Sequence, residues 1–123
     1  MLQEGLQYVS RLTVTDAVTA ITMGSGDMPV LATPAMMALM ENAAMLAVAD
    51  HLPEGSTTVG GHITSSHLKP SILGDTVTAT AIVTRVDGKK IEFAIQAHCG
   101  DVLLGEGTHL RFIVDKEKFM SRL

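Results

Sequence analysis

The hydrophobic pattern changes character along the chain, from one solidly apolar stretch to several stretches in which apolar and polar residues alternate. Residues 31–50, LATPAMMALMENAAMLAVAD, carry apolar side chains on every side of a helix. Thr33 followed by Pro34 is a typical helix start, in which the Thr hydroxyl accepts a free amide. We therefore expect a helix from about Pro34 to Ala49, capped by Thr33 and buried on most sides.

Strand-like segments flank this helix in the sequence. Residues 11–20, RLTVTDAVTA, predict a first strand that is followed by a Gly- and Pro-containing loop. Turn signals at 87–88 and 100–101 join the last three segments after the helix into an antiparallel meander, and Asp115 caps a short terminal helix. The β-rich segments after the long helix are 57–69, 75–86, 89–98 and 102–114.

The segment 89–98 shows how the sheet is covered. Ile91, Phe93, Ile95 and Ala97 face one way, while its polar residues face the other, as in a sheet with one covered face. Such a sheet buries the apolar helix on one side only. We predict a single α+β domain over 1–123 with the hotdog fold, an antiparallel sheet wrapped around a long apolar central helix. Because the other apolar side of the helix needs a covering partner, we predict at least a homodimer. A generic α+β sandwich monomer is the alternative.

Composition and charge exclude several classes of function. A chain of 123 residues that is 46% hydrophobic and 18% charged is typical of one folded domain. Its net charge of −4 and 3% aromatic content argue against nucleic-acid partners. Glu41 and Asn42 interrupt the only stretch that approaches a membrane span, so no membrane is expected. A lone Cys99 and the absence of a signal-peptide pattern predict a cytoplasmic protein.

Glu41 is the most unusual residue of the apolar helix. A carboxylate in apolar surroundings costs desolvation free energy, so it needs a compensating environment or a chemical role. It either reaches an exposed edge, bonds amides of a neighbouring strand, or takes part in catalysis. The free amides at the helix start near Thr33 are a second candidate, since they stabilise a developing oxyanion.

Other chemistry is poorly supported. The histidines form no HxxxH or HxH pair, so we expect no metal site and interpret each alone as structural. No G-x-S-x-G elbow occurs, and nothing in the sequence activates Cys99. The five histidines are His51, His62, His67, His98 and His109.

Three segments together resemble the fluoroacetyl-CoA thioesterase family of hotdog proteins. They are VLATPAMMALME (30–41), VGGHITSSHLKP (59–70) and EGTHLRFIVDKEKF (106–119), and the resemblance runs from about 30 to 119. It implies hydrolysis of an acyl-CoA thioester by a group formed by Thr33, Glu41 and His67, with CoA as part of the substrate and no separate cofactor. The resemblance places Gly60 against the acyl group, and the further substrate-binding positions we expect are Pro34, Ala35, Asn42 and Gly61.

The loop before the helix departs from the family. It reads MGSGDMPV, without an aromatic residue, whereas the fluoroacetate-specific enzyme has a phenylalanine-bearing lid. We therefore expect a short or medium acyl-CoA rather than fluoroacetyl-CoA. Glu41 would be the nucleophile or the general base, His67 would transfer protons, and Thr33 would orient Glu41, His67 or the carbonyl.

Helix geometry adds a hypothesis about assembly. Eight residues separate Thr33 from Glu41, a rise of about 12 Å, which is too far for direct contact. We therefore expect a site shared between two subunits, with a dimer of dimers left open. The rival functions are a non-catalytic acyl-CoA binding module and a hotdog hydratase or dehydratase. Candidate cations for the CoA phosphates are Lys69, Arg85, Lys89, Lys90 and Arg111.

Overall fold

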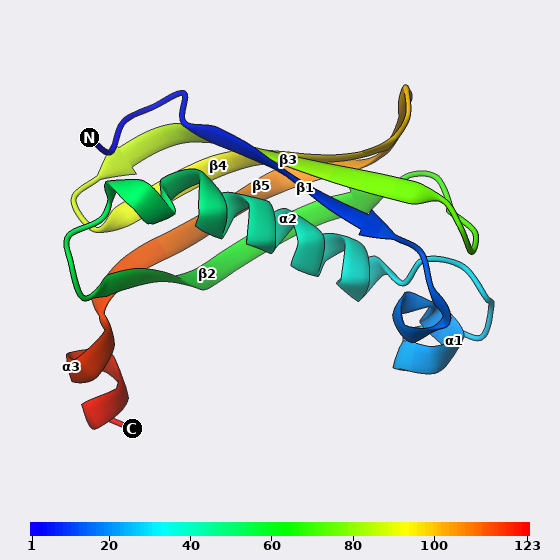
Figure 1. Cartoon of the computed structure of the whole chain (residues 1–123), viewed down its shortest axis with the longest axis horizontal. Helices are drawn as coiled ribbons and strands as arrows, with labels where there is room; N and C mark the ends of the chain where they lie inside the picture. Colours follow the sequence, from blue (N-terminus) through cyan, green and yellow to red (C-terminus); the bar gives the residue numbers. More distant parts are fainter.

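The computed structural model describes all residues 1–123 and contains one sheet wrapped around one long helix (Figure 1). The strands pair antiparallel in the order β1-β3-β4-β5-β2, and α2 lies mainly against β1 and β3. This is the predicted α+β hotdog arrangement. The elements are β1 (Gln7–Thr13), α1 (Ala20–Met23), α2 (Thr33–Val48), β2 (Ser56–His67), β3 (Thr76–Asp87), β4 (Lys90–Cys99), β5 (Val102–Asp115) and α3 (Lys116–Ser121).

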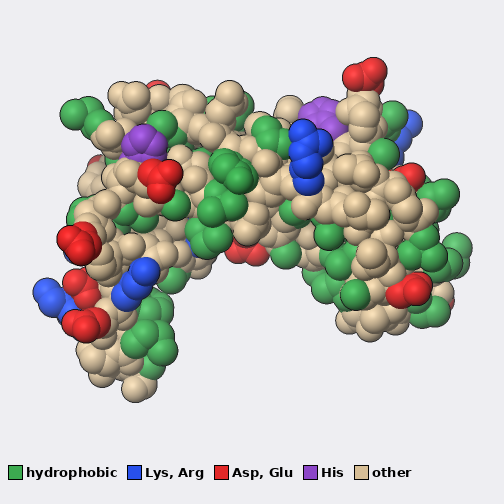
Figure 2. All heavy atoms as spheres, in the orientation of Figure 1, with side chains coloured by type: hydrophobic (Ala, Val, Ile, Leu, Met, Phe, Trp, Pro, Cys, Tyr) green, Lys and Arg blue, Asp and Glu red, His purple; other side chains and the backbone are tan.

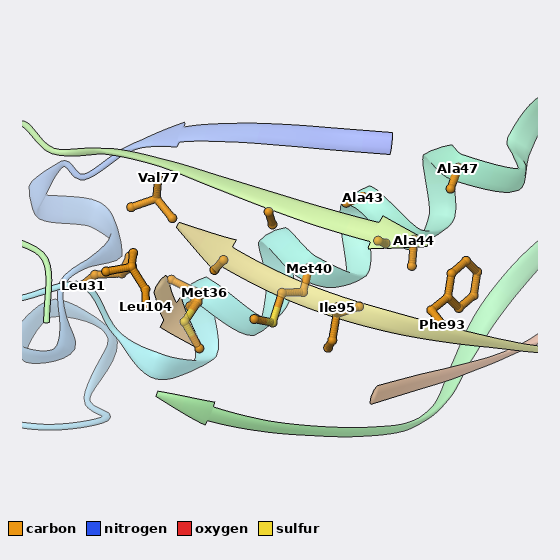
Figure 3. Packing of buried hydrophobic residues seen from close by; sticks show 14 of the residues in the cluster. Leu31, Met36, Met40, Ala43, Ala44, Ala47, Val77, Phe93, Ile95 and Leu104 are labelled. Carbon is orange, nitrogen blue, oxygen red and sulfur yellow. The ribbon is translucent and has the colours of Figure 1, made fainter. Parts of the chain in front are cut away.

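The core fills the space between α2 and the concave face of the sheet (Figure 3). Met36 and Met40 of α2 are fully buried, and on the sheet side Ile95 and Phe93 of β4 are each 1% exposed, with Phe93 beside Ala44 of α2 (Figure 3). The predicted alternation of β4 is therefore confirmed. Burial of one such side chain contributes about 1.5–3 kcal/mol, so this layer holds α2 in place on the sheet.

The first strand lies earlier than the sequence predicted. β1 covers Gln7–Thr13, whereas the predicted strand over 11–20 continues into a 3₁₀ turn at Asp16–Val18 and the short helix α1. Thr19 explains the error, because its hydroxyl accepts the backbone N–H of Thr22 and caps α1. β-branched residues favour strands, but threonine is equally suited to a helix cap.

The start of α2 corrects the predicted role of Thr33. Ala32 is the extended residue before the helix, and Thr33 is the first helical residue, with no side chain capping this end. The cap position falls one residue earlier than predicted, and Pro34 is tolerated in the second helical position because the first four N–H groups of a helix have no partner within it. The Thr33 hydroxyl is therefore free for another partner. The helix ends at Val48, one residue before the predicted end.

The remaining strands and α3 confirm the sequence prediction within two residues. β3, β4 and β5 form the antiparallel meander, and Asp115 caps α3 by accepting the Lys118 N–H at 3.0 Å. The first hairpin loop is Gly88-Lys89, one residue later than expected, since Asp87 pairs with Lys90. Gly88 has a φ of 60°, and positive φ at the first loop position is what a type II′ turn requires.

One side of α2 is uncovered, and the sheet is open at both of its edge strands, β1 and β2. Hydrophobic side chains lie along the α2 face and around α1 in Figure 2, and a groove of about 350 Å³ runs between β1 and α2. The outer edge of β2 has no strand beside it. No helix has the length and apolar character needed to cross a membrane. The groove is lined by Leu12, Ala17, Val18, Met23, Ala35, Ala38, Leu39 and Asn42.

Candidate functional site

Thr33 and His67 form a hydroxyl–imidazole pair where α2 begins and β2 ends. The Thr33 Oγ1 and His67 Nδ1 atoms lie 2.7 Å apart. The other ring nitrogen of His67, Nε2, is shielded and has no hydrogen-bond partner. Burial lowers the pKa of His67 below its ordinary 6.5, and a backbone contact with Lys69 acts weakly in the opposite direction. His67 is therefore neutral near pH 7, with one nitrogen positioned by Thr33.

The hydroxyl–imidazole pair opens onto a cavity of about 300 Å³. Residues of the 20–31 segment form one wall, and the stretch that follows β2 forms another. The lining contains one charged side chain, Lys69, and no aromatic residue, in agreement with the sequence of the loop before α2. The lining residues are Ala20, Ser25, Val30, Leu31, Thr33, His67, Leu68, Lys69 and Pro70.

Glu41 lies in a second group of residues, the Gly60 cluster, which consists of Glu41, Gly60, His109 and Arg111. A Cβ placed on Gly60 would lie 3.0 Å from Glu41 Oε2, 3.4 Å from His109 Cε1 and 3.7 Å from Arg111 Nη1. The three side chains therefore converge on one glycine. The chain's ion pairs involve Arg85 alone, so Arg111 acts on the half-buried Glu41 through its field rather than through a direct contact.

His109 and Arg111 are the residues of this cluster that the sequence did not reveal. They are 2% and 7% exposed and lie two residues apart on the inner face of β5. The sequence around them misleads, because the apolar neighbours Leu110 and Phe112 point to the outer face. Arg111 was expected among the surface cations for CoA phosphates, and its burial makes that expectation wrong. The i, i+2 spacing of two basic residues was the available signal.

Hydrogen bonds hold Arg111 firmly. Its Nε donates to Thr58 Oγ1 at 2.8 Å, its Nη2 donates to the Thr58 carbonyl at 2.9 Å, and its Nη1 lies 3.2 Å from His109 Nε2. His109 Nδ1 in turn lies 2.7 Å from the His62 carbonyl oxygen. A fixed cation thus stands beside Glu41 and offsets the cost of placing a carboxylate there.

The predicted site residues do not meet in one place within the chain. Thr33 pairs with His67, while Glu41 meets Gly60, and no contact joins the two groups. Asn42 instead accepts a hydrogen bond from Ser10 Oγ at 2.7 Å, which ties α2 to β1.

The other expected substrate-binding positions are scattered. Pro34 is exposed at the start of α2, Ala35 faces the groove of α2, and Gly61 lies under the ring of Phe112. Gly60, by contrast, lies against the carboxylate of Glu41, a residue of another element. No group of three His, Cys, Asp or Glu side chains is arranged to hold a metal ion.

Comparison with known families connects this geometry to a class of proteins. Residues 14–117 match the family described as "Fluoroacetyl-CoA-specific thioesterase". The fluoroacetyl-CoA thioesterase of Streptantibioticus cattleyicolor is 36% identical over 94 residues, which cover 76% of this chain and 68% of that protein.

Solved structures of similar proteins have the same architecture. A fluoroacetyl-CoA thioesterase structure superposes with a TM-score of 0.91 at 30% identity, over 99% of this chain and 95% of that one. A thioesterase superfamily member from Thermus thermophilus gives a TM-score of 0.90 at 26% identity, over 98% and 90% of the two chains. A hot-dog-like protein from Thermanaerovibrio acidaminovorans gives 0.88 at 25% identity, over 98% and 90%.

Proposed function

Because this chain belongs to the family of fluoroacetyl-CoA-specific thioesterases, we propose that it hydrolyses a short or medium acyl-CoA thioester to the free acid and CoA. The observation that carries the proposal is the hydroxyl–imidazole pair, whose two residues line a cavity of about 300 Å³ and whose His67 Nε2 has no hydrogen-bond partner. A neutral imidazole in that position accepts a proton from water or returns one to the leaving thiolate.

The hydrogen bond between Thr33 and His67 favours one of the roles considered for Thr33. Its hydroxyl contacts His67 and lies far along α2 from Glu41, so we assign it the task of orienting the imidazole. The first amides of α2 lie beside it and have no side-chain cap. They are available to stabilise the oxyanion that forms on the thioester carbonyl.

Glu41 completes the proposed reaction as a nucleophile or as a general base. In either case the net reaction adds one water, the carbon–sulfur bond breaks, and the CoA thiolate takes up a proton. Arg111 keeps a positive charge near this carboxylate.

We propose further that the site is completed by a second copy of the chain. Within β2, a register shift between Gly60 and His62 brings Gly60 and His67 to the same face of the strand. If the free edge of β2 pairs antiparallel with its own copy about Ile63 and Thr64, His67 of one subunit comes opposite Gly60 of the other. Glu41 of the partner subunit then approaches His67 and Thr33.

A thiol-release assay over acyl-CoA substrates of different chain length tests the activity. Glu41→Ala and His67→Ala should each slow release by about 10²-fold or more. A binding module would bind acyl-CoA without releasing thiol, and a hydratase or dehydratase would leave the thioester intact. Equal, slow release by the wild type and both variants would overturn the site assignment.

Mixing inactive variants tests the shared site. In a heterodimer of Glu41→Ala and His67→Ala subunits, one site has both functional side chains and the other has neither. Co-refolding the two variants should therefore restore about a quarter of the wild-type rate if subunits combine at random. A mixture as inactive as its components would show that each site lies within one chain.

The loop before α2 and Lys69 bear on substrate choice. Ser25 and Val30 leave the cavity wall without an aromatic side chain, which supports a general acyl group over fluoroacetyl. Among the cations expected to bind CoA phosphates, Lys69 alone lines the cavity, and Arg85 is engaged by Asp87 and Glu92. The absence of a separate cofactor and a cytoplasmic location remain predictions from the sequence.

A further inference from the structure

The tautomer of His109 is determined by its two partners. The His62 carbonyl oxygen only accepts hydrogen bonds, so His109 Nδ1 must carry a proton. Arg111 Nη1 only donates, so His109 Nε2, 3.2 Å away, must present its lone pair. His109 is therefore the neutral Nδ1–H tautomer, and no other protonation state satisfies both contacts.

This arrangement determines where the guanidinium of Arg111 points. Three of its five N–H groups are used, two by Thr58 and one by His109. Nη1, the nitrogen bound by His109, is also the guanidinium nitrogen that lies 3.7 Å from the Cβ position built on Gly60, and Glu41 Oε2 lies 3.0 Å from the same position. His109 therefore acts on the nitrogen of Arg111 that approaches the same glycine as Glu41, whereas Thr58 binds the other two nitrogens.

We infer that His109 is a positioning residue, which in its neutral Nδ1–H form holds the Arg111 guanidinium toward Glu41 and releases it when the imidazole is protonated. A second ring proton on Nε2 would meet the N–H of Arg111 and replace an attraction by a repulsion. The inference rests on the proposed role of Glu41, because the consequence for the reaction passes through that carboxylate.

The groups around His109 agree with a neutral ring. Burial lowers its pKa most, and the Arg111 and His62 charges lower it further. The hydrogen bond to the His62 carbonyl and the negative charge of Glu41 act in the opposite direction. Phe93 of β4, whose ring centroid lies 6.0 Å away, adds no charge. The net direction is downward, so protonation of His109 occurs on the acidic side of pH 6.5.

Two substitutions separate the contacts of His109. In His109→Gln the amide oxygen replaces Nε2 as acceptor for Arg111 and does not titrate. In His109→Asn the amide nitrogen replaces Nδ1–H as donor to the His62 carbonyl, but nothing reaches Arg111. His109→Asn should lower kcat by about 10- to 100-fold with little change in KM, while His109→Gln should stay within about threefold of the wild type.

The pH profile is the readout that a merely structural histidine would not alter. The acid limb of log kcat should fall with a slope of about two protons in the wild type, for His67 and His109, and about one in His109→Gln. His98→Gln, on the opposite face of β4, is the matched control and should leave both rate and slope unchanged. Thermal unfolding of each variant shows whether a lost rate reflects lost folding.

A direct measurement on the wild-type protein does not depend on the folding of any variant. The ¹⁵N chemical shifts of the His109 ring in the wild-type protein should report the neutral Nδ1–H tautomer at pH 7. The Nε2–H tautomer, or equal rates and identical pH profiles for all three variants and the wild type, would overturn the inference. If instead Glu41→Ala keeps full activity while His109 shows the expected tautomer, the proposed role of Glu41 fails, and the hydrogen-bond arrangement of His109 and Arg111 stands.

Discussion

The hydroxyl–imidazole pair and the Gly60 cluster differ in how firmly each is held. Thr33 and His67 share one hydrogen bond at the rim of an open cavity, and His67 keeps one nitrogen free. Arg111 in the Gly60 cluster is buried and bound by three contacts, two with Thr58 and one with His109. The first region leaves one ring nitrogen without a partner, and the second holds a charge in place.

In the proposed reaction neither region is sufficient for hydrolysis. An imidazole with a free nitrogen moves protons but has no carboxylate beside it within its own chain. A supported carboxylate has charge but no proton-transfer partner. The two regions lie apart on α2, because about 12 Å of helix separates Thr33 from Glu41. A second copy of the chain is the simplest way to join them.

The largest loss of rate is expected when a substitution removes the negative charge of Glu41 in the Gly60 cluster. Glu41→Gln keeps the size of the side chain and should lower kcat by about 10³-fold, because neither nucleophilic attack nor base catalysis survives loss of the carboxylate. Steady-state thiol release measures the effect. Glu117→Gln on the exposed helix α3 is the control and should be fully active. Retained activity in Glu41→Gln would remove the carboxylate from the mechanism.

The next largest effect is a loss of stability when the hydrogen bonds of Arg111 in the Gly60 cluster are broken. Arg111→Lys keeps the charge but cannot reproduce the fork that binds Thr58 and His109, so the free energy of unfolding should fall by about 1.5–3 kcal/mol. Urea denaturation followed by circular dichroism measures it. Arg85→Lys, at a side chain that is 65% exposed, should change little. Equal stability of both variants would show that Arg111 is not held as described.

Loss of the hydrogen bond in the hydroxyl–imidazole pair should lower the catalytic rate and leave the free energy of unfolding unchanged. Thr33→Val removes the hydrogen bond to His67 and should lower kcat about tenfold, the equivalent of about 1.4 kcal/mol. Thr33→Ser keeps the hydroxyl and should restore the rate. Because Thr33 does not cap α2, urea denaturation should show no loss of stability in Thr33→Val. A loss of about 1 kcal/mol would instead indicate a capping role.

The smallest expected effect is a decrease in stability at acidic pH, to which one histidine from each region contributes. The pKa values of His67 and His109 are both lowered by burial, so between their folded-state values and 6.5 the unfolded chain binds more protons than the folded one. Stability is therefore complete above pH 6.5 and declines as the pH falls below it. Denaturant midpoints at pH 8, 6 and 5 measure the decline, which His109→Gln should make shallower. A midpoint that rises on acidification would contradict the burial of both rings.

Local patterning was sufficient for most of the fold. The apolar run from Leu31 predicts a helix that must be buried, and the alternation of Ile91, Phe93 and Ile95 predicts a sheet with one covered face. Turn glycines place the hairpins within one residue. The predictions failed at Thr19 and Thr33, where one residue type suits a strand, a cap or a helix start.

The sequence by itself predicted the hotdog fold from the pattern of its apolar residues and the family from three matching segments, and the resemblance to that family implied roles for Thr33, Glu41 and His67. Only the tertiary structure decided which of them meet. The pairing of Thr33 with His67 spans 34 residues, and the approach of Arg111 and His109 to Glu41 spans about twice that distance along the chain. Contacts of that kind arise from strand register and from a bulge at Gly60, and neither leaves a periodic trace in the order of residues.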